Sequence, residues 1–185
     1  ATYASSGELD SASRIFENAT EPSSLLLYNA MIRALTLYGI TQRTIQLFLQ
    51  MHSLGLRGDN FTYPFVCKSC GDLRDVWFGK SVHSLILRCG LVFDIYVGTS
   101  LIDAYVKCGD LIDARKLFDE MPVRDVSTWN VLIAGYMKDG LFKYAEELFE
   151  EMPVRNIVSW TAMISGYAQN GLADKALQLF DKMLD

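Results

Sequence analysis

Two sets of polar residues recur at fixed places along this sequence, and their side chains are suited to hydrogen bonding. When the chain is divided into repeating units, the sets occupy the fifth and the last place of each unit. The fifth residues are Asn29, Pro64, Thr99, Asn130 and Thr161, and the last residues are Asp59, Asp94, Asp125 and Asn156. Threonine and asparagine side chains both donate and accept, whereas an ionised aspartate only accepts. Such different patterns are suited to reading the edges of nucleic-acid bases.

Two consecutive near-copies define the units most clearly. Residues 95–125 and 126–156 both close on the sequence Glu-Met-Pro-Val-Arg, and the next residue is Asp125 in one copy and Asn156 in the other. A constant frame that carries one variable polar residue is the pattern expected of a recognition element. We therefore expect the residue that changes to have a functional role.

The apolar residues of a unit follow helical spacing twice. In 126–156 they fall at i, i+3, i+4 and i+7 in two runs, which are Trp129, Leu132, Ile133 and Tyr136, then Ala145, Leu148, Phe149 and Met152. This spacing predicts two amphipathic helices. Gly140 favours the left-handed conformation that ends the first helix, and Pro153 ends the second. Each unit is therefore predicted to be a helical hairpin.

The same register extends over the chain and predicts one continuous array. The units are a partial one at 1–24, complete ones at 25–59, 60–94, 95–125 and 126–156, and a truncated one at 157–185. Lengths of 31 and 35 residues differ by about one helical turn of ~3.6 residues, which keeps facing side chains in phase. Because one hairpin cannot cover its own apolar face, we expect an all-α, right-handed α-solenoid of stacked antiparallel helix-turn-helix repeats.

The seam between units has its own recurring residues. An alanine in each second helix lets the backbones approach, and a phenylalanine one turn later fills the seam. The pairs are Ala114 with Phe118, Ala145 with Phe149, and Ala176 with Phe180. In the same register His83 takes a phenylalanine place, and Cys67 and Cys70 take core places. This predicts a packed imidazole and buried, reduced thiols, and argues against a zinc site.

Composition limits the other function classes. Half of the 185 residues are hydrophobic and only four are proline, which favours a folded helical chain over a disordered one. No apolar run approaches the ~18 to 20 residues that span a bilayer, so we expect a soluble protein. Neither of the two histidines lies in a catalytic or metal-binding motif. We expect no enzyme activity, no cofactor, no metal and no small-molecule substrate.

Two further sets of residues suit a nucleic-acid strand. The second residue of each unit lies one turn before the fifth, where an apolar group can hold a base flat. These residues are Leu26, Phe61, Tyr96, Ser127 and Val158. Lys107 and Lys138 take equivalent places near the end of the first helix and can reach phosphates. An alternative remains open, in which the fifth and last residues serve only as helix caps and turn formers.

The repeat resembles the pentatricopeptide repeat family, and the mixture of 31- and 35-residue units resembles its plant PLS subclass. Residues 25–59 are similar to the P-type unit, 60–94 to the L-type unit with its Gly79-Lys80-Ser81-Val82-His83, and 95–125 to the S-type unit, whereas 126–156 is S-type-like. The resemblance implies that the chain binds single-stranded RNA and reads one base per repeat. The rule of one base per repeat is a known property of the family, and the resemblance implies it for this chain.

The resemblance also implies a preference for each unit. Asn29 with Asp59 implies U, Thr99 with Asp125 implies G, and Asn130 with Asn156 implies C or U. Thr161 alone implies a purine, whereas Pro64, paired with Asp94, offers no side-chain hydrogen bond. With the N-terminal end of the array toward the 5′ end of the RNA, the implied target is U, any base, G, a pyrimidine and a purine.

The resemblance further implies a targeting module of an RNA-editing or RNA-processing factor in the mitochondrion or chloroplast. An editing-accessory protein is a possible partner at the unit 60–94, where Trp77 and Phe78 offer aromatic surface. The alternative function is a peptide-binding scaffold of the tetratricopeptide type. A steady period of about 34 residues is typical of such a scaffold. The mixed lengths do not fit it. A net charge of −5 predicts low non-specific affinity for RNA.

Overall fold

The computed structural model describes residues 14, 16 and 24–184, and the regular structure in this part of the chain is helical. The helices between residues 24 and 184 are α2 (Leu25–Leu37), α3 (Thr41–Ser53), α4 (Tyr63–Leu73), α5 (Val76–Arg88), α6 (Ile95–Cys108), α7 (Leu111–Glu120), α8 (Val126–Lys138), α9 (Phe142–Glu151), α10 (Ile157–Gln169) and α11 (Ala173–Leu184). Successive helices pair as five hairpins, and each hairpin lies within one of the units from residue 25 onward.

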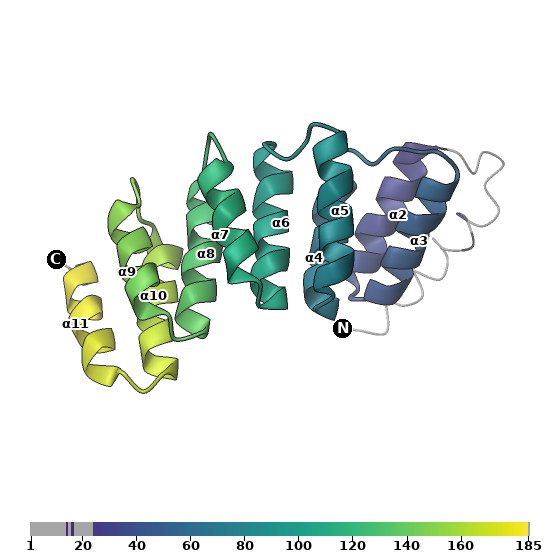
Figure 1. The fold of residues 1–185 in the computed structure, drawn as a ribbon. Coiled ribbons are helices and arrows are strands. Elements are labelled where there is room, and N and C mark those ends of the chain that lie inside the picture. The colour runs from purple at the N-terminus through teal and green to yellow at the C-terminus, as the bar shows by residue number, and fades with distance from the viewer. Residues whose placement is uncertain (1–13, 15, 17–23, 185) are drawn as a thin grey trace.

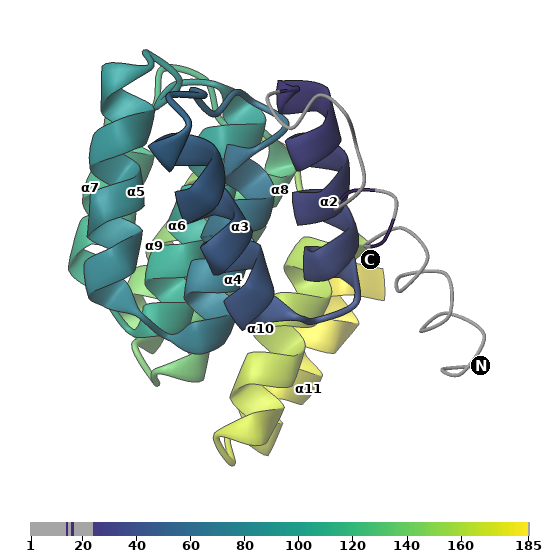
Figure 2. The same ribbon diagram turned by 90° about the vertical axis from the view of Figure 1, so that its right-hand side faces the viewer.

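The hairpins stack into a solenoid with two layers (Figure 1). The first helices of the hairpins, α2, α4, α6, α8 and α10, contact one another in series and form one layer. The second helices form the other layer, and α3, α5 and α7 each also contact the first helix of the following unit. In the end-on view the two layers lie side by side along the array (Figure 2). The predicted α-solenoid is confirmed.

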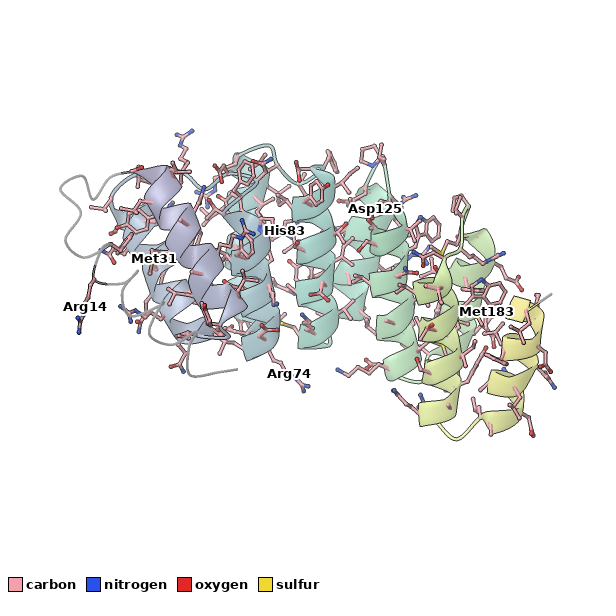
Figure 3. All side chains as sticks on the ribbon, turned by 180° about the vertical axis from the view of Figure 1, so that it is seen from behind. Arg14, Met31, Arg74, His83, Asp125 and Met183 are labelled. Atoms are coloured by element: carbon pink, nitrogen blue, oxygen red, sulfur yellow. The ribbon has the colours of Figure 1, made fainter. Side chains whose placement is uncertain are left out.

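The hairpin turns depend on left-handed residues. Gly109 ends α6 with a φ of 80°, and Gly39, Gly140 and Gly171 take the same place in their units with positive φ. The unit 60–94 differs, because the C-cap of α4 is Arg74. This residue adopts a left-handed φ of 56°, which a residue with a Cβ adopts less readily than glycine. Arg74 lies at the lower end of the layer of first helices (Figure 3). The glycine turn is therefore confirmed in four units and absent from one.

The seam between units is built as predicted in the middle of the array. Ala114 and Ala145 are fully buried, and the ring of Phe118 packs edge-on against Trp129 with centroids 4.8 Å apart. Phe149 and Trp160 repeat this contact at 4.9 Å. The prediction was wrong for Phe180, which is 43% exposed, because no described helix lies beyond α11 to cover its ring.

The cysteine and histidine predictions concern the neighbourhood of α4 and α5. Cys67 and Cys70 are buried and free, and burial raises the pKa of the Cys70 thiol to about 12. His83 is only half-buried, and its Nδ1 lies 2.8 Å from the hydroxyl of Tyr105, a core residue. The predicted packing of the His83 imidazole is therefore only partial, with its ring against Tyr105. Among the described residues, no group of three or more His, Cys, Asp or Glu side chains is placed to hold a metal ion.

Most of the partial unit at 1–24 lies outside the described residues. Phe16 is described, and its ring contacts Tyr28 of α2 edge-on with centroids 5.1 Å apart. None of the described helices has the length and apolar character needed to cross a membrane.

Candidate nucleic-acid interface

The last residue of each complete unit accepts backbone hydrogen bonds where the next unit begins, and in three of the four units it is the N-cap of the next helix. Asp125 Oδ1 accepts a hydrogen bond from the Thr128 backbone N–H at 2.8 Å, and Asn156 Oδ1 accepts one from Ser159 N at 3.0 Å. Asp94 Oδ1 accepts the N–H groups of Tyr96 and Val97 at the start of α6. Asp59 Oδ1 accepts the N–H groups of Phe61 and Thr62 in the turn that leads into α4, where Thr62 is the N-cap residue. The proposed role of these residues in helix entry is thus confirmed. Asp125 marks this edge of the layer in Figure 3.

The fifth residues lie inside the first helices, and two of them, Asn29 and Asn130, donate to the last residue of their own unit. Asn29 Nδ2 donates to Asp59 Oδ1 at 3.0 Å and to Oδ2 at 3.2 Å. Asn130 Nδ2 lies 3.4 Å from Asn156 Oδ1 as a weaker donor. The idea that Asn29 and Asn130 are themselves caps is wrong, because both lie within a helix. The fifth and last residues of these two units are neighbours, as the hairpin geometry predicted.

Thr99 and Asp125 are joined through a third residue. The hydroxyl oxygens of Thr99 and Thr128 are 2.7 Å apart, and Thr128 Oγ1 donates to Asp125 Oδ1 at 2.8 Å. The sequence reasoning missed this residue and its equivalents, Thr62 and Ser159. A hydroxyl at the third place of three units was the signal that it overlooked.

Two predicted recognition residues, Asp94 and Thr161, are not brought into such a pair, and Pro64 offers no side-chain hydrogen bond, as expected. Pro64 lies in the first turn of α4, where a backbone N–H would have no acceptor within the helix, so a proline is tolerated there. Asp94 caps α6 without a fifth-place partner. Thr161 donates its hydroxyl to the Ile157 carbonyl of its own helix at 2.7 Å. The pairing of recognition residues therefore extends to three units.

Two cavities lie over the directly paired residues. The first, of about 550 Å³, is lined by Leu26, Asn29, Asp59, Phe61 and Arg33 among others. Leu26 and Phe61 are the second residues of successive units and are 79% and 66% exposed. The cavity thus has an apolar side chain from each unit beside one polar pair. Arg33, one turn beyond Asn29, is a cationic residue that the sequence reasoning did not single out.

The second cavity, of about 480 Å³, repeats this arrangement three units further along the array. Ser127 and Val158 line it as second residues, and Asn130 and Asn156 line it as the polar pair. Asn130 is buried, and its Oδ1 has no hydrogen-bond partner within residues 24–184. Tyr96, the remaining second residue, is 75% exposed at the start of α6.

The two predicted phosphate-contacting lysines both line the second cavity but differ in their partners. Lys107 Nζ lies 2.8 Å from Asp103 and 3.5 Å from Asp72. Partial burial lowers the pKa of Lys107, but the hydrogen bond that Lys107 donates to Asp103 and the charges of Asp103 and Asp72 outweigh it and leave the pKa raised. Lys138 is exposed and has no ion pair with another described residue. Lys138 is therefore the more available of the two.

The aromatic pair proposed for a partner protein is divided between surface and core. Phe78 is partly buried, and its ring contacts Phe48 with centroids 6.5 Å apart. Trp77 is 78% exposed. Phe78 therefore serves packing, and only Trp77 offers surface.

Relatives of this chain are found among plant proteins. Three pentatricopeptide repeat-containing proteins of Arabidopsis thaliana are 37%, 37% and 39% identical to it over 122, 131 and 131 residues. The alignments cover 66%, 70% and 70% of this chain and 25%, 15% and 19% of those relatives. The chain thus spans a quarter or less of their length.

Solved structures share the fold. The pentatricopeptide repeat protein PPR10 in complex with an 18-nt psaJ RNA element matches with a TM-score of 0.70 and 17% identity, over 84% of this chain and 24% of PPR10. The crystal structure of PPR10 from maize matches with a TM-score of 0.63 and 18% identity, over 86% and 24% of the two chains. The profile of the PPR repeat matches residues 26–56, 99–126, 127–157 and 158–185. Because these matches cover more than half of its length, the chain belongs to the PPR repeat family.

Proposed function

We propose that this chain is a sequence-specific, single-stranded RNA-binding module in which successive units each read one base. This proposal rests on the repeated cavity, in which the second residues of two successive units flank one pair of fifth and last residues. A base has two flat faces and one polar edge, and each cavity offers groups for all three. The relation to PPR10, which was solved with an RNA element, supports this proposal.

The first cavity suits uracil. One N–H of Asn29 Nδ2 points to Asp59, and an amide NH₂ group has a second hydrogen to donate. Among the described residues, Asp59 Oδ2 accepts a hydrogen bond from Asn29 alone, at 3.2 Å, so this oxygen retains lone pairs. The pair therefore offers one donor beside one acceptor. Uracil presents the complement, because its N3–H donor lies beside a carbonyl oxygen, whereas cytosine has an acceptor at N3.

The second cavity suits cytosine among the pyrimidines. The cap holds Asn156 Oδ1 against Ser159, so the group left to face a base is Asn156 Nδ2, which has no partner among the described residues. An N–H donor matches the acceptor N3 of cytosine and opposes the N3–H of uracil. The cap thus fixes which end of the Asn156 amide is presented. We assign cytosine as the preferred base of the unit 126–156.

The charge distribution supports specificity more than general affinity. The chain carries 17 basic and 22 acidic residues, and Lys107 is already paired with two carboxylates. The amino ends of the first helices direct partial positive charge toward the row of caps. Arg33 and Lys138 are the exposed cations that line the two cavities. We therefore expect weak binding to RNA of unrelated sequence.

We further propose that the chain is the non-catalytic targeting part of an organellar RNA-editing or RNA-processing factor of the PLS type. The mixed unit lengths and the plant relatives support this assignment. One relative, 29% identical over 127 residues, is named as chloroplastic.

The test measures binding of the chain to fluorescently tagged RNA by anisotropy at low salt. The proposal predicts binding to a single strand containing U, any base, G and C in this order, and weaker binding to the same sequence in a duplex. Equal binding to duplex and single strand would contradict it. A chain that ignores RNA but binds extended peptides would instead support the tetratricopeptide-type scaffold.

A further inference from the structure

Three buried hydroxyls lie directly beneath the recognition pairs. They belong to Thr62, Thr128 and Ser159, each the third residue of its unit, and all three are fully buried. Each contacts the last residue of the preceding unit through its side chain. Thr62 and Thr128 also reach the fifth residue of that preceding unit. Thr62 and Thr128 therefore lie between two groups that are proposed to face a base, and Ser159 contacts one such group, Asn156.

We propose that the third-place hydroxyl is a positioning residue that sets whether the preceding unit's recognition pair donates or accepts. This inference rests on the proposed RNA binding and deepens it. The hydroxyl does not face the base itself, because it is buried. It acts by donating a hydrogen bond to one member of the pair and accepting hydrogen bonds from other groups, which fixes the role left to the pair.

Counting protons at Thr128 shows how this works. Asp125 is a carboxylate and only accepts, so the 2.8 Å contact from Thr128 Oγ1 uses the Thr128 hydroxyl proton. The 2.7 Å contact with Thr99 must then be supplied by the Thr99 proton. Thr99 is left with lone pairs alone to present outward. Thr128 has converted a group that can donate or accept into an acceptor.

The resulting pair has a defined complement. Thr99 and Asp125 both present acceptors, and Asp125 Oδ2 has no partner within the described part of the chain. Guanine is the base whose Watson–Crick edge carries two adjacent donors, N1–H and the N2 amino group. Adenine carries an acceptor at N1, which would oppose the carboxylate or the Thr99 lone pairs. The arrangement gives a physical reason for guanine at the unit 95–125.

Thr62 acts on an amide instead of a hydroxyl. Its Oγ1 donates to Asn29 Oδ1 at 2.6 Å, the shorter of its two possible contacts. The oxygen of the Asn29 amide is thereby held inward, and Nδ2 is held toward Asp59 and the cavity. The hydroxyl thus fixes Asn29 as the donor of its pair.

Of the four junctions that follow a complete unit, one lacks this device, and it lacks a polar pair as well. The third residue of the unit 95–125 is Val97, which is fully buried and has no hydroxyl. The preceding unit carries Pro64 at its fifth place, which has no side-chain proton to orient. The hydroxyl is therefore present at the three junctions where the fifth residue is polar and absent from the one where it is not.

The test replaces Thr128 and measures binding of RNA with G or A opposite the unit 95–125. Thr128→Val keeps the shape of the side chain, and the backbone N–H of residue 128 still donates to Asp125. The Thr99 hydroxyl loses its acceptor and becomes free to donate to the base. We expect the preference for G over A to fall by roughly tenfold, the low end of what one polar base contact contributes. Thr128→Ser keeps the hydroxyl and should retain the preference.

A double-mutant cycle separates positioning from general destabilisation. If Thr128 acts through Thr99, Thr128→Val should change the G-to-A ratio little in a Thr99→Val background. An unchanged ratio in the single variant, or an undiminished effect in that background, would overturn the inference. Should Thr128→Val fail to fold by circular dichroism, Thr62→Val tests the same claim through loss of U-over-C preference, and an unchanged preference would overturn it. A wild-type chain that ignores G against A would instead refute the proposed function.

Discussion

The side-chain nitrogen of Asn29 donates to the carboxylate of Asp59 at 3.0 Å, across an interval of 30 residues. The contact joins the start of one hairpin to its end. Asp59 Oδ1 also accepts the backbone N–H groups of Phe61 and Thr62, so one oxygen holds the turn that leads into the next helix. The last residue of a unit is thus a structural cap on one atom and a candidate contact for RNA on the other.

This division predicts the effect of Asn156→Asp. The substitution keeps the capping oxygen and replaces the outward Nδ2 donor with an acceptor, which gives the same pair as Asn29 with Asp59. Preference at that base should move from C to U by roughly tenfold or more, since one mismatched polar contact costs about 1 to 3 kcal/mol. Anisotropy with RNAs that differ only at this base measures the change. Asp125→Asn is the matched control, which should alter recognition at the neighbouring base and leave this one unchanged.

The exposed side chains over the first cavity predict a loss of affinity without a loss of stability. Phe61→Ala should weaken RNA binding by about 1 to 3 kcal/mol, because the ring would no longer stack on a base. Its thermal unfolding should change little, since Phe61 is 66% exposed. Phe118→Ala is the buried comparison and should cost about 3 to 5 kcal/mol of stability. A Phe61→Ala chain that binds RNA as tightly as wild type would remove the stacking role.

The two lysines of the second cavity should differ in their response to salt. Lys138→Ala should lower the slope of log affinity against log salt by about 1, because a free cation would lose its phosphate contact. Lys107→Ala should lower it less, since Asp103 and Asp72 already neutralise Lys107. Titrations at several salt concentrations give both slopes. Equal slopes for the two variants would contradict the assignment.

His83 predicts a pH dependence of stability. Burial lowers the pKa of His83 below its usual value, and the nearby carboxylates of Asp113 and Glu120 oppose this without cancelling it. The unfolded chain therefore binds the proton more tightly, and the free energy of unfolding should decrease as the pH falls below about 6.5. His83→Phe, which installs the residue found at this place in neighbouring units, should flatten that decrease. Denaturant unfolding between about pH 7.5 and 5.5 measures it. A slope that persists in His83→Phe but disappears in His52→Gln would assign the effect to the other histidine.

The repeating frame could be predicted from the sequence because its apolar spacing is periodic. Phe118 and Ala145 lie where the helical register placed them, and the turns at Gly109 and Gly140 have the expected left-handed backbone. Phe180 was misjudged because its burial depends on a neighbouring unit and not on its own spacing. Local pattern determines a helix, whereas burial at an end depends on what stacks upon it.

The recognition pairs were partly predictable for the same reason. Asn29 and Asp59 meet because a hairpin returns its end to its start, and this follows from the fold. The hydroxyl between Thr99 and Asp125 was not anticipated, because Thr128 belongs to the next unit. Counting within single units hides a contact that crosses from one unit to the next.

The central claim is tested most directly by a complete base-substitution series with the wild-type chain. Every position of a short single strand carrying U, any base, G and C is changed in turn to the other three bases, and each affinity is measured at one low salt concentration. The account predicts the tightest binding for U, G and C opposite the units 25–59, 95–125 and 126–156, and little discrimination opposite 60–94. Equal affinity for all four bases at the three paired units would contradict it.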